Sequence, residues 1–96
     1  MIKHIILWNF QEGLGTEENK LKIKNDLEAL KNIIPGIVSI EVIVNPVAGS
    51  NADIMLYSVF ESEEALNNYQ VHPEHVKAAT FVKSVVCNRM CMDYTV

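Results

Sequence analysis

Two stretches of this sequence are apolar on both faces of an expected strand, and this feature limits what the chain can fold into. Residues 2–10 and 53–60 are rich in the β-branched and aromatic side chains that strands favour. Successive side chains of a strand point to opposite faces. Leu7 would then lie on one face of the first strand, and Ile6 and Trp8 on the other. A sheet built from such strands has to be covered on both faces.

The order of the expected elements defines the fold class. Read in order, the elements are a strand at residues 1–10, a helix capped by Thr16 and running to about 32, strands at 37–44 and 53–60, a pair of helices from the cap Ser62 to about 83, and a strand at 85–94. The pattern β-α-β-β-α-β is typical of a ferredoxin-like α+β fold, with an antiparallel four-stranded sheet and helices on one face. The 96 residues predict one domain, 1–96.

Because helices on one face leave the other face of the sheet open, we expect a second copy of the chain to cover it. The expected partner is therefore the chain itself, in a homodimer formed through the sheet face. A net charge of −4, with lysines interspersed among acids, argues against nucleic acid or an anionic membrane as a partner. Residues 2–10 are too short for a membrane span of about 20 residues.

The two cysteines indicate a compartment. Cys87 and Cys91 lie four residues apart on the expected last strand, so their α-carbons are about 13 Å apart. This separation is too large for a disulfide between them. Two free thiols favour a reducing environment, and we expect a cytoplasmic protein.

Residues 69–76 carry the candidate chemistry. Pro73 cannot continue a preceding helix but suits the first position of a new one. Tyr69 then falls on the inner stripe of the first helix, and His75 in the first turn of the second also points inward. The helix N-terminus disfavours the imidazolium form of His75. A neutral imidazole can act as a base near neutral pH.

Each of these residues also has a purely structural interpretation. His72, beside Pro73, is typical of a helix junction whose ring bonds the backbone. His4, Tyr69 and His75 could equally be core residues with satisfied polar atoms. A metal site from the three histidines is not expected, because no clear carboxylate or cysteine completes the set. No cofactor is expected either.

The chain resembles a known family at four places, taken together. The matching segments are Ile2-Lys3-His4-Ile5-Ile6-Leu7, Ile34-Pro35-Gly36-Ile37, His72-Pro73-Glu74-His75-Val76 and Asp93-Tyr94-Thr95. In their order and spacing they resemble the Dabb family of stress-responsive dimeric α/β-barrel proteins. The resemblance implies a homodimer whose two sheets pack face to face. It also implies a cleft in each protomer between the sheet and its own helices.

One member of that family, the plant polyketide cyclase olivetolic acid cyclase, implies roles for particular residues. His75 matches its catalytic histidine and Tyr69 its catalytic tyrosine. The resemblance therefore implies that His75 takes a proton next to a carbonyl and Tyr69 hydrogen-bonds the carbonyl oxygen. The expected ligand is a small apolar molecule. The residues expected to bind it are His4, Ile6, Trp8, Ile23, Leu27 and His72. Ile23, Lys24 and Leu27 stand where that cyclase has aromatic residues, so its own substrate is not carried over.

Two other function classes remain open on the sequence. One is a non-catalytic, ligand-binding or structural role. The other is a cofactor-free or haem-degrading monooxygenase, because such families share the dimeric barrel. The haem enzymes use an Asn, a Trp and a His around the cleft, for which Asn9, Trp8 and His75 are the candidates here.

Overall fold

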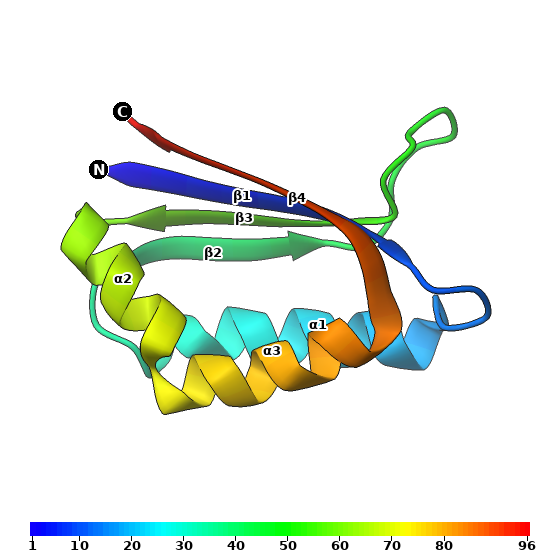
Figure 1. The fold of residues 1–96 in the computed structure, drawn as a ribbon, viewed down its shortest axis with the longest axis horizontal. Coiled ribbons are helices and arrows are strands. Elements are labelled where there is room, and N and C mark those ends of the chain that lie inside the picture. The colour runs from blue at the N-terminus through cyan, green and yellow to red at the C-terminus, as the bar shows by residue number, and fades with distance from the viewer.

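The computed structural model describes all residues from 1 to 96 and confirms the ferredoxin-like fold (Figure 1). The elements in order are β1 (Ile2–Phe10), α1 (Glu17–Glu28), a 3₁₀ helix (Ala29–Asn32), β2 (Ile37–Ile43), β3 (Ile54–Phe60), α2 (Glu63–Val71), α3 (Pro73–Val85) and β4 (Val86–Thr95). The sheet has four strands in the order β2-β3-β1-β4, and all neighbours are antiparallel. The helices lie on one face of this sheet, and the two termini lie at the same end (Figure 1).

The helix starts are fixed by side-chain caps, as the sequence predicted. The Thr16 side chain accepts a hydrogen bond from the Asn19 backbone N–H at 3.2 Å. The Ser62 side chain accepts one from Ala65 N–H at 3.1 Å. Acidic residues occupy the first turn of both helices, where the positive end of the helix dipole stabilises them. The expected end of the first helix near residue 32 needs a correction, because its last turn tightens into the 3₁₀ helix.

A partly exposed ion pair with backbone contacts holds α1 against β2. Lys24 Nζ lies 2.7 Å from the Glu28 carboxylate and donates to the Val42 carbonyl oxygen, also at 2.7 Å. The Glu28 carboxylate accepts from the Val42 N–H at 2.9 Å. The rotation of α1 about its axis is therefore fixed, and Leu27 faces the sheet.

The face of the sheet that meets the helices is the core. Alternate residues of β1 and β3 are buried there: Ile2, His4, Ile6 and Trp8, with Ile54, Leu56, Ser58 and Phe60. Two of them are polar, His4 and Ser58. The Ser58 hydroxyl donates to the backbone oxygen of His4 at 2.8 Å, so its hydrogen bond is satisfied inside the core.

The opposite face of the sheet is apolar and uncovered in the single chain. Its exposed apolar side chains are Leu7, Met90, Met92 and Tyr94. Leu7 and Met90 lie directly opposite each other across β1 and β4. The apolar character of both faces, expected from the sequence, is therefore present. None of the helices combines the length and the hydropathy that crossing a bilayer requires.

Gly36 provides a test of how α2 packs on the turn before β2. Its φ is +91°, and an added Cβ would lie 2.6 Å from the Ala65 Cβ. Gly49 has a φ of +100° with no atom within 4 Å of an added Cβ. Gly49→Ala should therefore cost only the left-handed backbone penalty, about 1–2 kcal/mol. Gly36→Ala should cost about 1–3 kcal/mol more, from overpacking. Denaturant unfolding measures both, and equal losses would contradict the packing described.

Candidate functional site

A cavity of about 460 Å³ lies between the sheet and the helix layer. Its floor comes from β1 and β3, its walls from α1, α2 and α3, and one edge from β4. The lining residues are His4, Ile6, Trp8, Leu27, Leu56, Tyr69, Gln70, His75, Ala79, Val82, Lys83 and Arg89. Its size and mostly apolar lining, with a few polar groups, are those of a small-molecule site.

Tyr69 lines this cavity and carries a buried, unpaired hydroxyl. Its side chain is fully buried, yet its hydroxyl makes no hydrogen bond with any protein group. The ring is held by Phe60, with ring centroids 4.8 Å apart, and by His75, at 4.2 Å. Burial raises the pKa of Tyr69 far above its ordinary value, so the hydroxyl stays protonated. It is therefore a neutral hydrogen-bond donor without an acceptor.

His75 is oriented as a neutral base. Its Nδ1 lies 3.2 Å from the backbone oxygen of Gln70. Because a carbonyl only accepts, Nδ1 carries the proton and Nε2 keeps a free lone pair. Burial lowers the pKa of His75 and is the largest influence, whereas the bond to Gln70 raises it. Nearby positive charges, that of Lys83 among them, lower it further. The sequence predicted the neutral form from the helix N-terminus, whereas burial is the larger cause here.

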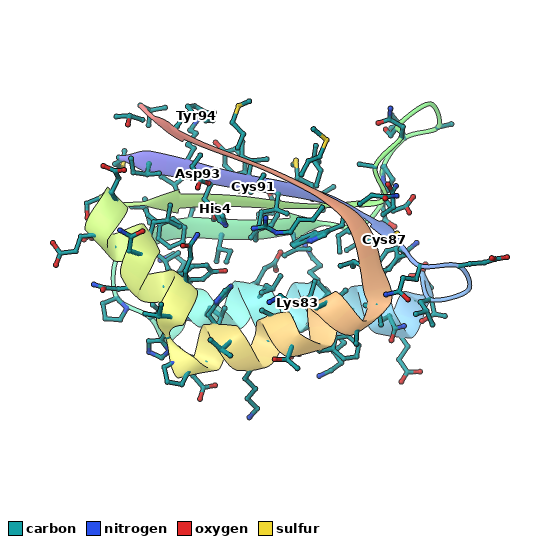
Figure 2. All side chains as sticks on the ribbon, in the orientation of Figure 1. His4, Lys83, Cys87, Cys91, Asp93 and Tyr94 are labelled. Atoms are coloured by element: carbon teal, nitrogen blue, oxygen red, sulfur yellow. The ribbon has the colours of Figure 1, made fainter.

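His4 is a second histidine of the cavity, with an acidic partner. It is 2% exposed, and its Nδ1 hydrogen-bonds the carboxylate of Asp93 on β4. The two residues are direct partners in the register of β1 and β4. Figure 2 shows His4 close to Asp93 and Cys91, which come from the neighbouring strand. In the neutral ring, donation from Nδ1 to the carboxylate leaves Nε2 as the acceptor nitrogen.

The structure brings together most of the residues predicted for the site. His4, Ile6, Trp8, Leu27, Tyr69 and His75 all line the cavity. Ile23 does not, because it is fully enclosed in the core. His72 does not either: its Nδ1 accepts from the Glu74 N–H at 3.1 Å and caps α3. Its placement in the cleft was therefore wrong, and its interpretation as a junction residue that bonds the backbone is confirmed.

Lys83, Arg89 and Asp93 are polar residues of this region that the sequence analysis missed. Lys83 lies four residues after Ala79, which lies four after His75, so helical spacing alone was a usable signal. Arg89, Cys91 and Asp93 alternate along β4 and share a face. Their proximity to His4 depends on the register of β1 with β4, which no local pattern shows.

The residues that could hold a metal ion are also brought together by the register of β1 with β4. One ligand atom each from His4, Cys91 and Asp93 lie within 4.8 Å of one another. The sequence analysis considered only a site of the three histidines and found no carboxylate or cysteine to complete it, whereas the structure brings Cys91 and Asp93 to His4 alone. The His4 nitrogen is already engaged by Asp93, however. Burial, together with the negative charge of Asp93, raises the pKa of the Cys91 thiol, which disfavours the thiolate that a metal binds best.

The constellation suggested by haem enzymes is not assembled. Trp8 and His75 line the cavity, but Asn9 does not. The Asn9 side chain donates to the Asn51 backbone oxygen at 3.0 Å and accepts from Asn88 at 3.3 Å. Since Asn9 follows Trp8 in β1, its side chain points to the other face.

The fold and site together define a small ferredoxin-like domain with a cavity between its sheet and its helices. Residues 2–96 match the model of the stress responsive A/B barrel domain, Dabb, and the chain belongs to this family.

Three known proteins show how far the similarity extends. The stress-response A/B barrel domain-containing protein HS1 of Arabidopsis thaliana is 24% identical, over 97% of this chain and 87% of its own. A dimeric protein of unknown function and ferredoxin-like fold from Bacteroides fragilis is 34% identical, with a TM-score of 0.87 over 99% of this chain and 95% of that one. A hydroxynitrile lyase from Passiflora edulis is 16% identical, with a TM-score of 0.85 over 99% and 92% of the two chains. At that identity the lyase shares the fold alone.

The environment of His75 predicts its titration. Its pKa should lie below the ordinary 6.5. Because the unfolded chain binds this proton at higher pH, the residue contributes stability above pH 6.5 that is lost as the pH falls through the folded pKa.

Lys83→Gln should raise the pKa of His75, because it removes a nearby positive charge. NMR titration of the imidazole signals measures both effects. Lys77→Gln, on the same helix but outside the cavity, is the control. An unchanged His75 pKa in Lys83→Gln would contradict the cavity geometry.

Proposed function

We propose that this protein binds a small, largely apolar carbonyl compound in the cavity. The observation that carries the proposal is the Tyr69 hydroxyl, which is buried, protonated and without a protein partner. A buried donor of this kind costs free energy until an acceptor reaches it. A ligand carbonyl oxygen at the Tyr69 hydroxyl would supply that acceptor, and the apolar lining would hold the rest of the molecule.

We further propose that His75 and Tyr69 act on this ligand as a base and an electrophile. His75 Nε2 would take a proton from the carbon next to the carbonyl. The electrons of that C–H bond would form an enolate, whose oxygen the Tyr69 hydroxyl hydrogen-bonds. His75 would then return the proton to the product. This scheme is of the lyase or cyclase type, and it uses only side chains of this chain.

Two similarities support the second proposal. The resemblance to the plant polyketide cyclase assigns the same two roles to His75 and Tyr69. A hydroxynitrile lyase with the same fold indicates that lyase chemistry can be built on this architecture. The ring contact between Tyr69 and His75, at 4.2 Å between centroids, allows both residues to act on one small molecule.

Exchange of ketone α-protons for solvent deuterium tests the chemistry without knowledge of the substrate. With 4-phenylbutan-2-one as the probe, the protein should accelerate exchange. His75→Ala and Tyr69→Phe should each reduce that acceleration about 100-fold. NMR follows the loss of the α-proton signal. His72→Asn is the matched control, since Asn keeps the helix cap and removes an imidazole outside the cavity. Exchange that is unaffected by His75→Ala would reject the proposed base.

We also propose that two copies of the chain pair through the open face of the sheet. Solved structures similar to this chain include dimeric proteins of the same fold. The exposed apolar residues of that face, Leu7, Met90 and Met92, need a cover, and an identical face supplies one. An interface of about 800 Å² per partner would be ordinary for such a dimer.

The dimer proposal predicts a mass of twice 10.8 kDa in solution. Leu7→Glu should give a monomer at micromolar concentration, because it places a charge within the apolar face, opposite Met90. Val76→Glu, at an exposed position of α3, should leave the dimer intact. Sedimentation or light scattering distinguishes the two states. A monomeric wild-type chain, or a dimeric Leu7→Glu variant, would contradict the proposed interface.

We also propose that this acidic protein is located in the cytoplasm, which is a reducing compartment. Cys87 and Cys91 are both free thiols. The net charge of −4 gives no support to a nucleic-acid partner.

A further inference from the structure

Two cations line the cavity, and no carboxylate does. Lys83 of α3 and Arg89 of β4 are both exposed at the surface and border the cavity. Figure 2 places Lys83 on the side of α3 that faces the sheet. Neither residue forms an ion pair; the ion pairs of the chain involve His4, Lys20, Lys22 and Lys24. In a chain of net charge −4, this opening is a local concentration of unpaired positive charge.

The C-terminal end of α3 explains only one of the two cations, Lys83. Lys83 lies in the last turn of α3, where the helix dipole stabilises a cation. The helix dipole does not explain Arg89, because this residue lies on strand β4. It is placed at the cavity by an irregularity of the sheet.

That irregularity is a β-bulge between β1 and β4. Leu7 pairs with Met90 and Asn9 pairs with Cys87, so Asn88 and Arg89 both lie opposite Trp8. Asn88 has a φ of +55° and is the only residue other than glycine with a positive φ. Bulges bend a strand and redirect side chains, and strained residues of this kind concentrate at functional sites. The strain at Asn88 therefore coincides with the point where Arg89 reaches the cavity.

We propose that the ligand of this cavity carries a small anionic group, bound between Lys83 and Arg89 at the opening. A carboxylate, or a phosphate, would accept hydrogen bonds from the planar Arg89 guanidinium and from the Lys83 ammonium. The apolar body of the ligand would lie over Ile6, Trp8 and Val82. The part of this inference that places a ligand carbonyl at Tyr69 rests on the proposed function. The anion site itself does not need it.

Matched acid and ester ligands test the proposal directly. The probes are 4-oxo-4-phenylbutanoate, its methyl ester, and the phosphonate with the same carbon skeleton. Calorimetry or ligand-observed NMR gives the Kd of each. The wild-type protein should bind the carboxylate or the phosphonate at least about 10-fold more tightly than the ester. The tighter of the two identifies the anionic group that the site prefers.

Single charge-removing variants then assign the preference to the two residues. Lys83→Gln and Arg89→Gln should each weaken binding of the preferred anion about 10-fold and leave the ester unchanged. Lys77→Gln is the control, because it removes the same charge from the same helix outside the cavity. A ¹H–¹⁵N spectrum shows that each variant is folded.

The outcomes separate this inference from the proposed function. An ester that binds wild-type protein as tightly as either anion overturns the anion site, as does the failure of both anions to bind. An anion preference that survives in Tyr69→Phe, while that variant leaves ketone exchange unchanged, upholds the anion site and rejects the proposed chemistry. Loss of the preference in Lys77→Gln as well would show a general charge effect and would overturn the assignment.

Discussion

The two-residue period of β1 is the constraint on which the rest of the structure depends. It commits His4, Ile6 and Trp8 to the helix layer and Leu7 to the opposite face. A slip of one residue would exchange the two sets and expose the whole core side. Two polar contacts oppose such a slip: the bond from His4 to Asp93, and the bond from Ser58 to the His4 carbonyl. The polar groups in the core thus fix the register, and one of them, His4, also lines the cavity.

The sequence was sufficient for the parts of the fold that depend on local chemistry. Caps at Thr16 and Ser62 and the break at Pro73 are properties of a few neighbouring residues. The faces of β1 followed from alternation alone. The same local chemistry also placed Tyr69 and His75 on inward stripes, on either side of the junction at His72.

The remaining parts of the site depend on how distant segments meet. The approach of Asp93 to His4 requires the register of two strands at opposite ends of the chain, which the bulge at Asn88 shifts. Ile23 and Leu27 share one helical stripe, but Ile23 is fully enclosed in the core whereas Leu27, one turn further along α1, lines the cavity. Neither the bulge nor the position of the cavity along α1 leaves a signature in a short stretch of sequence.

The unpaired Tyr69 hydroxyl carries a stability cost, which the proposed ligand would offset. An unpaired buried hydroxyl costs about 1–3 kcal/mol, against a total stability of about 5–15 kcal/mol for a domain of ordinary size. The free energy of unfolding of Tyr69→Phe, without ligand, tests this account most directly. The account predicts that the variant is as stable as wild type or more stable by about 1–2 kcal/mol, because Phe keeps the ring and removes the unpaired hydroxyl. A loss of more than about 1 kcal/mol would show that the hydroxyl already makes a stabilising hydrogen bond in the free protein, and would contradict the account.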